Sequence, residues 1–192
     1  MQPAARAYRA VLPSFVRTSV GNVFSNIGDV GNVLNNGLQG KLGAAYADLG
    51  RVFINSTLGL AGLFDIASEA GIEKHNEDFG QTLGAWGARS GSFLMLPILG
   101  PTSTRDALGS VVDYATNPMT FVDPTGAQLA LRGAEGIEVR VQLLEVGAVL
   151  EKSVLDPYLF IRDAYFQRRE ALVRDGRPAP AAEGLDLVER TE

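Results

Sequence analysis

Apolar residues recur three or four positions apart along most of the chain, which is the spacing of one face of an α-helix. The spacing predicts a first helix over 14–27, a second that starts with Asp29 as its N-cap and stops at Gly40, and a third over 42–53. No stretch alternates apolar and polar residues as a half-buried strand does. The pattern therefore predicts an all-α fold of amphipathic helices with wide apolar faces.

Helical spacing continues in the C-terminal half, where the capping signals are clearer. Either Ser103 or Thr104 is expected to cap a short helix, and a long helix is expected over 127–150. The last helix is the best marked, because Asp156 can act as its N-cap and Pro157 can occupy its first position.

A glycine-rich and proline-rich passage separates these two halves. It reads FGQTLGAWGARSGSFLMLPILGP, and its glycines and prolines make a long regular helix improbable. We therefore expect a helical hairpin or a pair of short helices. The spacing of Gly84, Gly87 and Gly91 would place a strip without side chains on one helical face, and such a strip would let the hairpin shift and act as a gate.

Composition and charge exclude several classes of function. The chain has 192 residues, of which 46% are hydrophobic and 20% charged, and its formal net charge of −5 disfavours nucleic acid as a partner. The absence of cysteine excludes disulfides, thiolate metal sites and a lipobox cysteine. The longest uncharged stretch, Ser90 to Thr104, is shorter than the roughly 20 residues that a spanning helix needs. No signal peptide precedes the first helix, so an anchor cannot be read from this chain.

Few residues suggest catalysis or metal binding. His75, the only histidine, lies in the polar segment EKHNED and is expected to be a solvated loop residue. A metal site that combines it with Glu73, Glu77 and Asp78 is a weaker reading, because the segment lacks the spacing of a calcium loop. Because no nucleophile–base pair is evident, we expect no enzymatic activity, no metal and no cofactor.

A basic run lies on the last helix and admits two interpretations. Its members are Arg162, Arg168, Arg169 and Arg174. Most simply, these arginines form the solvated face of a terminal helix. Alternatively, Arg162, Arg168 and Arg169 contact lipid phosphates, for which the guanidinium group is well suited.

Two environments are compatible with short, strongly apolar helices. One is the interior of a water-soluble bundle, and the other is a membrane interface with the apolar faces turned outward. The interface predicts an exposed apolar belt. Its candidate residues are Phe15, Val23, Phe24, Leu38, Tyr46 and Phe53.

Four blocks of the chain resemble the VacJ/MlaA family of lipoproteins. In order they are YRAVLPSFVRTSVGNVFSNIGDVGNVLNNGLQGK, RVFINSTLGLAGLFDIA, EDFGQTLGAWGARSGSFLMLPILGPTSTRDALGSVVD and DPYLFIRDAYFQRRE. The likeness runs from about Pro3 to Arg174. On this basis we divide the chain into a family-like helical domain over 1–176 and a flexible C-terminal tail over 177–192.

The resemblance implies a fold, a location and a function. It implies a ring-like, or doughnut, arrangement of helices around a central amphipathic channel, at the periplasmic face of the outer membrane. Phospholipid misplaced in the outer leaflet would pass through this channel to a soluble periplasmic lipid-carrier protein, which would maintain the asymmetry of the membrane. A trimeric porin would be a further partner.

The same resemblance places the glycine-rich hairpin beside the channel. The residues implied are Gly84, Trp86, Gly87, Gly91, Phe93, Leu94, Met95, Leu96, Pro97 and Gly100. Core packing is the alternative role for each of them. For the whole protein, the alternatives are an envelope scaffold that binds porins or other membrane partners without moving lipid, and an interfacial phospholipase, which the missing nucleophile–base pair disfavours.

Overall fold

The computed structural model describes residues 13–96, 100–121, 133 and 156–177. The predicted helix over 127–150 (apart from Gly133, which is helical), Pro97 at the expected hairpin and the tail beyond Arg177 lie outside the described residues. The described helices are α2 (Ser14–Leu38), α3 (Leu42–Thr57), α4 (Ile66–Glu69), α5 (Phe79–Ala85), α6 (Thr104–Thr116), the 3-10 helix η1 (Pro118–Phe121) and α8 (Pro157–Val173). The two strands are β1 (Phe93–Leu96) and β2 (Gly100–Ser103).

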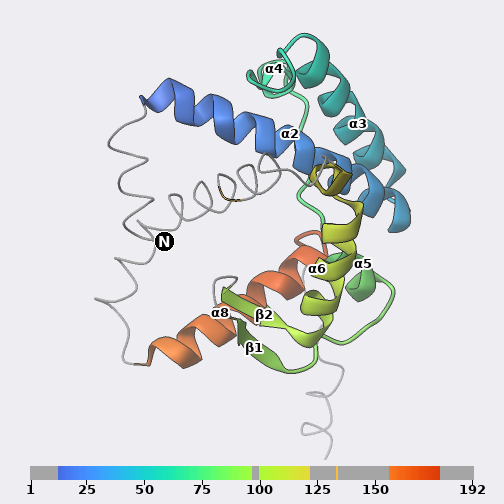
Figure 1. Ribbon diagram of the computed structural model, residues 1–192. Coiled ribbons are helices and arrows are strands. Elements are labelled where there is room, and N and C mark those ends of the chain that lie inside the picture. The colour runs from blue at the N-terminus through green and yellow to red at the C-terminus, as the bar shows by residue number, and fades with distance from the viewer. Residues whose placement is uncertain (1–12, 97–99, 122–132, 134–155, 178–192) are drawn as a thin grey trace, which may run out of the picture.

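Helix α2 is one continuous helix of 25 residues, so the prediction of two helices divided at Asp29 is wrong. Asp29 is fully buried inside the helix and bonds to other segments instead of capping one. Asn26, Asp29 and Asn32 lie three positions apart, so they share a face of a single helix. Figure 1 shows α2 and α3 packed along each other at one end of the molecule.

The glycine-rich passage forms a β-hairpin, which corrects the expected helical hairpin. Strands β1 and β2 pair antiparallel, with Phe93 opposite Ser103 and Leu96 opposite Gly100. Gly87 and Gly91 have φ angles of +95° and +73°, a conformation that favours glycine and that no α-helix contains. The predicted helical fold class is confirmed, because the described residues are mostly helical, and the hairpin adds one short two-stranded sheet to it.

Aromatic side chains join the β-hairpin to α8. The ring of Phe93 makes edge contacts with Tyr158, Tyr165 and Phe166, at centroid distances of 5.7, 5.8 and 6.0 Å. Such pairs add stability beyond the area that they bury. The start of α8 is confirmed, because Asp156 accepts the backbone N–H groups of Tyr158 and Leu159 at 3.0 and 3.1 Å.

The cap of α6 is confirmed as well. Ser103 is the N-cap residue, and its hydroxyl accepts the backbone N–H of Asp106 at 3.2 Å. The helix runs to Thr116.

Polar residues, rather than apolar ones, fill the interior of the described part of the chain. Within that part, Ala67 and Met119 are the only hydrophobic residues that are fully buried. The buried polar residues are Asn26, Asp29, Asn32, Asn35, Asn36, Asp48, Arg51, Asn55, Gln81, Thr82, Ser103, Arg105 and Asp106. This distribution is the reverse of that in a water-soluble domain.

Helix α3 shows the reversal most clearly. Its buried residues are Asp48, Arg51 and Asn55. Its exposed large apolar residues are Leu42, Tyr46, Leu49 and Phe53. Both sets recur three or four positions apart, so α3 turns its polar face inward and its apolar face outward.

The predicted apolar belt is confirmed in part. Phe15, Leu38, Tyr46 and Phe53 are exposed, whereas Val23 and Phe24 are half-buried. Further exposed apolar side chains lie on α6 and on the loop after α3, including Leu108, Val111, Leu58 and Leu60. None of the described helices combines the length and the hydropathy that crossing a bilayer requires.

Candidate functional site

Arg51 joins four segments in the polar interior. Its side chain is 1% exposed, and its Nε–H donates to Asp29 on α2 at 3.3 Å. One terminal nitrogen donates to both carboxylate oxygens of Asp65, at 3.0 and 3.1 Å, and the other to the carbonyl of Ile72 at 2.7 Å. Lys74 adds a second cation to Asp29 at 2.7 Å. The buried charges are therefore paired, as a polar interior requires.

A second group of polar contacts links the α2–α3 turn to the segment over 72–78. Glu77 accepts hydrogen bonds from Gln39 at 2.8 Å and from Lys41 at 3.0 Å. Burial disfavours the charged form of Lys41, but its bonds to Asp175 and Glu77 outweigh that effect and raise its pKa. The end of α8 is thus tied to the turn between α2 and α3.

His75 is less solvated than its sequence context predicts. It lies in a loop, as expected, but its backbone N–H donates to Asp48 at 3.2 Å and its Nδ1 lies 3.3 Å from the same oxygen. Asp48 is itself fully buried and accepts a bond from Asn36 at 2.9 Å. Among the described residues, no set of three His, Cys, Asp or Glu side chains is arranged to hold a metal ion.

Arg169 holds α8 against α5 and α6. Its Nη2 lies 2.7 Å from Asp78 and 3.0 Å from Asp106. Burial works to raise the pKa of both carboxyl groups, but bonds from Arg169 lower the pKa of Asp78, and bonds from Tyr165 and Arg169 lower the pKa of Asp106. The Tyr165 hydroxyl also donates to Asp106, and burial together with that bond raises the pKa of Tyr165.

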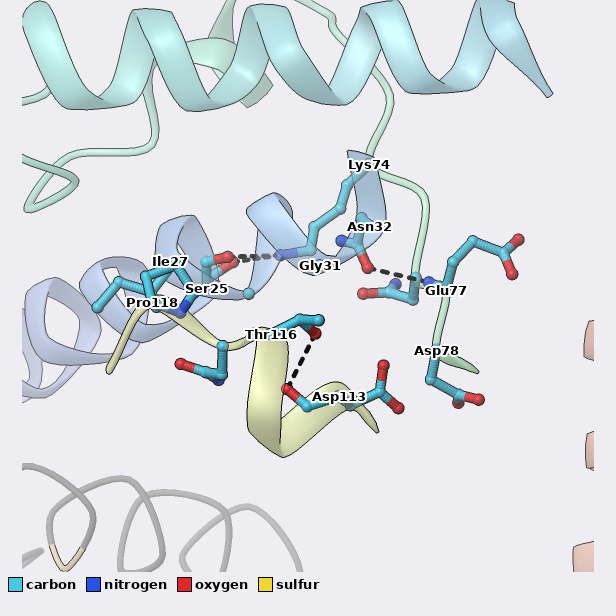
Figure 2. A pocket seen from close by; sticks show the side chains of 13 residues that line it. Ser25, Ile27, Gly31, Asn32, Lys74, Glu77, Asp78, Asp113, Thr116 and Pro118 are labelled. Carbon is cyan, nitrogen blue, oxygen red and sulfur yellow. Dashed lines mark hydrogen bonds between the residues drawn. The ribbon is translucent and has the colours of Figure 1, made fainter. Parts of the chain in front are cut away.

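A polar cavity opens beside this interior. We call it the α2–α6 cavity; its volume is about 300 Å³. Its lining includes Ser25, Gly28, Gly31, Asn32, Lys74, Asn76, Glu77, Asp78, Asp113, Thr116 and Pro118. Figure 2 shows Gly31 and Asn32 of α2 on one side and Asp113 and Thr116 of α6 on the other.

Two further hollows adjoin the α2–α6 cavity. The α8 cavity, of about 550 Å³, shares Asn32, Asn76, Glu77 and Asp78 with it and is also lined by Gln81, Tyr165, Arg168 and Arg169. The apolar groove, of about 340 Å³, shares Asp113 and Thr116 with it and is also lined by Val33, Leu34, Leu38, Phe79 and Val112. Polar cavities and an apolar groove therefore meet along α2 and α6.

The residues predicted for the hairpin lie in three different places. Gly84 is in α5, where an added Cβ would lie 2.7 Å from Val173, so its role there is close helix packing. Trp86 ends α5, is exposed, and donates its indole N–H to the carbonyl of Leu38 at 3.2 Å. Gly87 and Gly91 lie in the turn after α5, so they form no strip on a helix face.

The remaining hairpin residues belong to the two strands. Phe93, Leu94, Met95 and Leu96 form β1, and Gly100 begins β2 with a φ angle of +85°. Met95 is exposed, whereas Phe93 packs on α8.

The three arginines predicted to contact phosphate differ in their surroundings. Arg169 is engaged by Asp78 and Asp106, and Arg162 pairs with its neighbour Asp163 at 2.9 Å. Arg168 is exposed, lines the α8 cavity, and has no ion-pair partner within the described part of the chain.

Most of the residues that line the α2–α6 cavity were not predicted from the sequence. Asn32, Asp113 and Lys74 were not predicted as site residues, although they line the α2–α6 cavity. The sequence of α2 held a signal for them, because polar residues recur three or four positions apart along it: Asn22, Asn26, Asp29, Asn32 and Asn36. Such a polar stripe indicates a polar interior when the opposite faces are apolar.

Comparison with known proteins identifies the family. The model of the MlaA lipoprotein family matches residues 1–172. The intermembrane phospholipid transport system lipoprotein MlaA of Escherichia coli is 32% identical over 190 residues, which cover 94% of this chain and 72% of the relative. The corresponding protein of Haemophilus influenzae is 30% identical, with 96% and 75% covered.

A solved structure supports the same assignment. It is described as the structural basis for maintenance of bacterial outer membrane lipid asymmetry, and it matches with a TM-score of 0.77 and 31% identity. The match covers 90% of this chain and 87% of that one. With a family match over nearly its whole length and a shared fold, this chain belongs to the MlaA lipoprotein family.

Proposed function

We propose that this protein is a phospholipid-transport component that maintains outer-membrane lipid asymmetry from the periplasmic face of that membrane. The observation that carries the proposal is the inverted distribution of residues, with paired charges and polar cavities inside and large apolar side chains outside. Relatives in Escherichia coli and Haemophilus influenzae are named for intermembrane phospholipid transport.

The apolar exterior fits a position within one leaflet of a bilayer. A large apolar side chain left in water forgoes about 1.5–3 kcal/mol relative to its buried state. Tyr46 and Phe53 are 73% and 68% exposed on the same face of α3. Acyl chains would recover that free energy without a helix that spans the membrane.

The interior fits the passage of a polar headgroup. The α2–α6 cavity and the α8 cavity share Asn32, Asn76, Glu77 and Asp78, so a headgroup would meet hydrogen-bonding groups from one cavity to the next. Arg168, whose charge is unpaired within the described residues, is the cation in this set that suits a phosphate. We propose that these cavities form part of the channel of a ring-like arrangement.

The proposed role requires partners and no catalysis. A trimeric porin would hold the protein in the outer membrane, and a soluble periplasmic carrier would receive the lipid. Phospholipid hydrolysis is disfavoured because the described residues place no hydroxyl in hydrogen-bond contact with His75, whose ring faces Asp48.

Gly31→Leu provides a test with a matched control. Gly31 lines the α2–α6 cavity, and an added Cβ would meet no atom within 4 Å, so a side chain can start there and leucine would narrow the cavity. Gly43, in α3, has equally open surroundings and is absent from the lining of the cavities described above. Each variant would be expressed with an N-terminal lipid anchor in a Gram-negative strain that lacks its own relative.

Outer-leaflet phospholipid and protein abundance are measured together. We expect the parent chain and Gly43→Leu to lower outer-leaflet phospholipid, and Gly31→Leu to fail at equal abundance. Full activity of Gly31→Leu would show that this cavity is not the passage. If the protein binds porin but its presence never changes lipid asymmetry, a scaffold role would replace the proposed transport.

A further inference from the structure

Asp113 differs from the other carboxylates that line the cavities described above. Its carboxylate accepts hydrogen bonds from the backbone N–H of Phe79, at 3.0 and 3.1 Å, and from the amide of Asn35 at 3.3 Å. Both donors are neutral, and no described lysine or arginine forms an ion pair with Asp113. Asp29, Asp78 and Asp106, by contrast, each pair with an arginine.

The described cations around the cavity already have carboxylate partners. Of the charged residues that line the α2–α6 cavity, Lys74 pairs with Asp29 at 2.7 Å. Glu77 pairs with Lys41 at 3.0 Å, and the charge of Asp78 is met by Arg169. Among the described charged residues of the cavity lining, Asp113 therefore carries a negative charge that no lysine or arginine balances. Burial raises the pKa of Asp113, because an unpaired charge there is costly, and an incoming cation would offset that cost.

The position of Asp113 suggests the shape of the ligand. Together with Thr116 it lines both the polar α2–α6 cavity and the apolar groove. Figure 2 shows its carboxylate pointing from α6 towards the segment that carries Glu77 and Asp78. A molecule that places a cation at Asp113 can therefore lay an apolar chain against Val33, Leu34 and Phe79.

We propose that Asp113 recognises the primary ammonium group of a phospholipid such as phosphatidylethanolamine, with an acyl chain in the adjoining apolar groove. The inference rests on the proposed function and adds a headgroup preference to it. The ammonium group would donate charge-assisted hydrogen bonds to the carboxylate, which are about twice as strong as neutral ones. An anionic headgroup without an amine, such as phosphatidylglycerol, would bring a negative charge to a negative site.

A structural role for Asp113 must be separated from recognition. Its bond to Phe79 joins α6 to the start of α5, and Asp113→Asn keeps an oxygen acceptor for that bond while it removes the charge. Gly31→Leu serves as the second variant, because it narrows the same cavity and leaves the carboxylate in place.

Native mass spectrometry of the full chain in detergent is the test. Phosphatidylethanolamine and phosphatidylglycerol with identical acyl chains are supplied in equal amounts, with glycerophosphoethanolamine as a chain-free competitor. We expect a preference on the order of tenfold for phosphatidylethanolamine, which corresponds to one charge-assisted contact. Asp113→Asn should bind both lipids equally, Gly31→Leu should bind less of each, and the chain-free competitor should displace little.

The outcomes distinguish this inference from the proposed function. Equal binding of the two lipids by the parent chain, or a preference that survives in Asp113→Asn, would overturn recognition by Asp113. Full displacement by glycerophosphoethanolamine would overturn the acyl-chain groove. If the parent chain binds neither lipid, the proposed transport of phospholipid itself fails.

Discussion

Arg51 on α3 and Asp29 on α2 form an ion pair whose side chains are 1% and 0% exposed. The pair takes the place that leucine and isoleucine side chains hold between helices of a soluble bundle. Buried ion pairs seldom stabilise more than apolar packing would, but breaking one leaves an uncompensated charge. In this protein, the faces that would otherwise supply an apolar core are turned outward.

Replacing Arg51 should therefore be strongly destabilising. Arg51→Ala removes the donor to the Ile72 carbonyl and leaves Asp29 with Lys74 and the amide of Asn32 as its described partners. We expect a loss of about 3 kcal/mol in the free energy of unfolding, measured by denaturation in detergent. Arg162→Ala, which breaks the exposed pair with Asp163, should change stability by less than about 1 kcal/mol. Similar losses for the two variants would contradict a special role for the buried pair.

Stability should also fall in acid because of Asp65. Burial favours its protonated form, but hydrogen bonds from Ser68 and Asn55 and the charge of Arg51 lower its pKa to about 2. Since the folded-state pKa lies below the unfolded value of about 3.9, Asp65 stabilises the fold above that unfolded value. This contribution is lost as the pH falls through the folded-state pKa.

Melting temperatures recorded across that acidic range would check the expectation. Asp65→Asn should start from a lower melting temperature at neutral pH and fall less on acidification than the parent chain does. Asp163→Asn, at an exposed position, should follow the parent chain. A parent-like slope in Asp65→Asn would assign the acid sensitivity to other groups.

Glycine at position 84 allows α5 and α8 to approach closely. A Cβ added there would lie 2.7 Å from Val173 and 2.8 Å from Arg105. We expect Gly84→Ala to cost about 1–3 kcal/mol through overpacking. Gly43→Ala, in open space within α3, should instead gain about 0.5–1 kcal/mol because alanine favours the helix. Thermal denaturation of the two variants checks whether the signs are opposite.

Several helix starts of this protein can be predicted from its sequence, whereas most residues of the polar interior and its cavities cannot. Capping residues such as Ser103 and Asp156 act locally, within three residues of their partners, so the starts of α6 and α8 were predicted. Asp29 was misread as a cap because its partners, Arg51 and Lys74, lie far along the chain.

The β-hairpin could not be predicted from the sequence pattern either. The segment Phe93–Leu96 is uniformly apolar, so periodicity cannot separate a strand from a buried helix. Its strand conformation depends on pairing with Gly100–Ser103 and on the contact of Phe93 with Tyr158. Asp113 escaped prediction for a similar reason: that no described lysine or arginine pairs with it becomes visible only in the assembled fold.

The outward apolar face of α3 leads to the last prediction. Tyr46 and Phe53 lie seven residues apart, two turns along one face, and both are largely exposed. If this face meets acyl chains, the double variant Tyr46→Asp, Phe53→Asp should weaken binding to phospholipid vesicles. A charged residue costs up to about 2.5–3.5 kcal/mol at the centre of a bilayer.

Flotation with phosphatidylethanolamine–phosphatidylglycerol vesicles measures the effect. Gln167→Asp on α8 is the control, because it adds a negative charge at an exposed polar position. The melting temperature in detergent should stay close to that of the parent chain for both variants, since neither replaces a buried side chain. Unchanged flotation of the double variant would mean that α3 does not face lipid. The exposed apolar face of α3 would then be a protein-binding surface, and a porin, rather than acyl chains, would cover it.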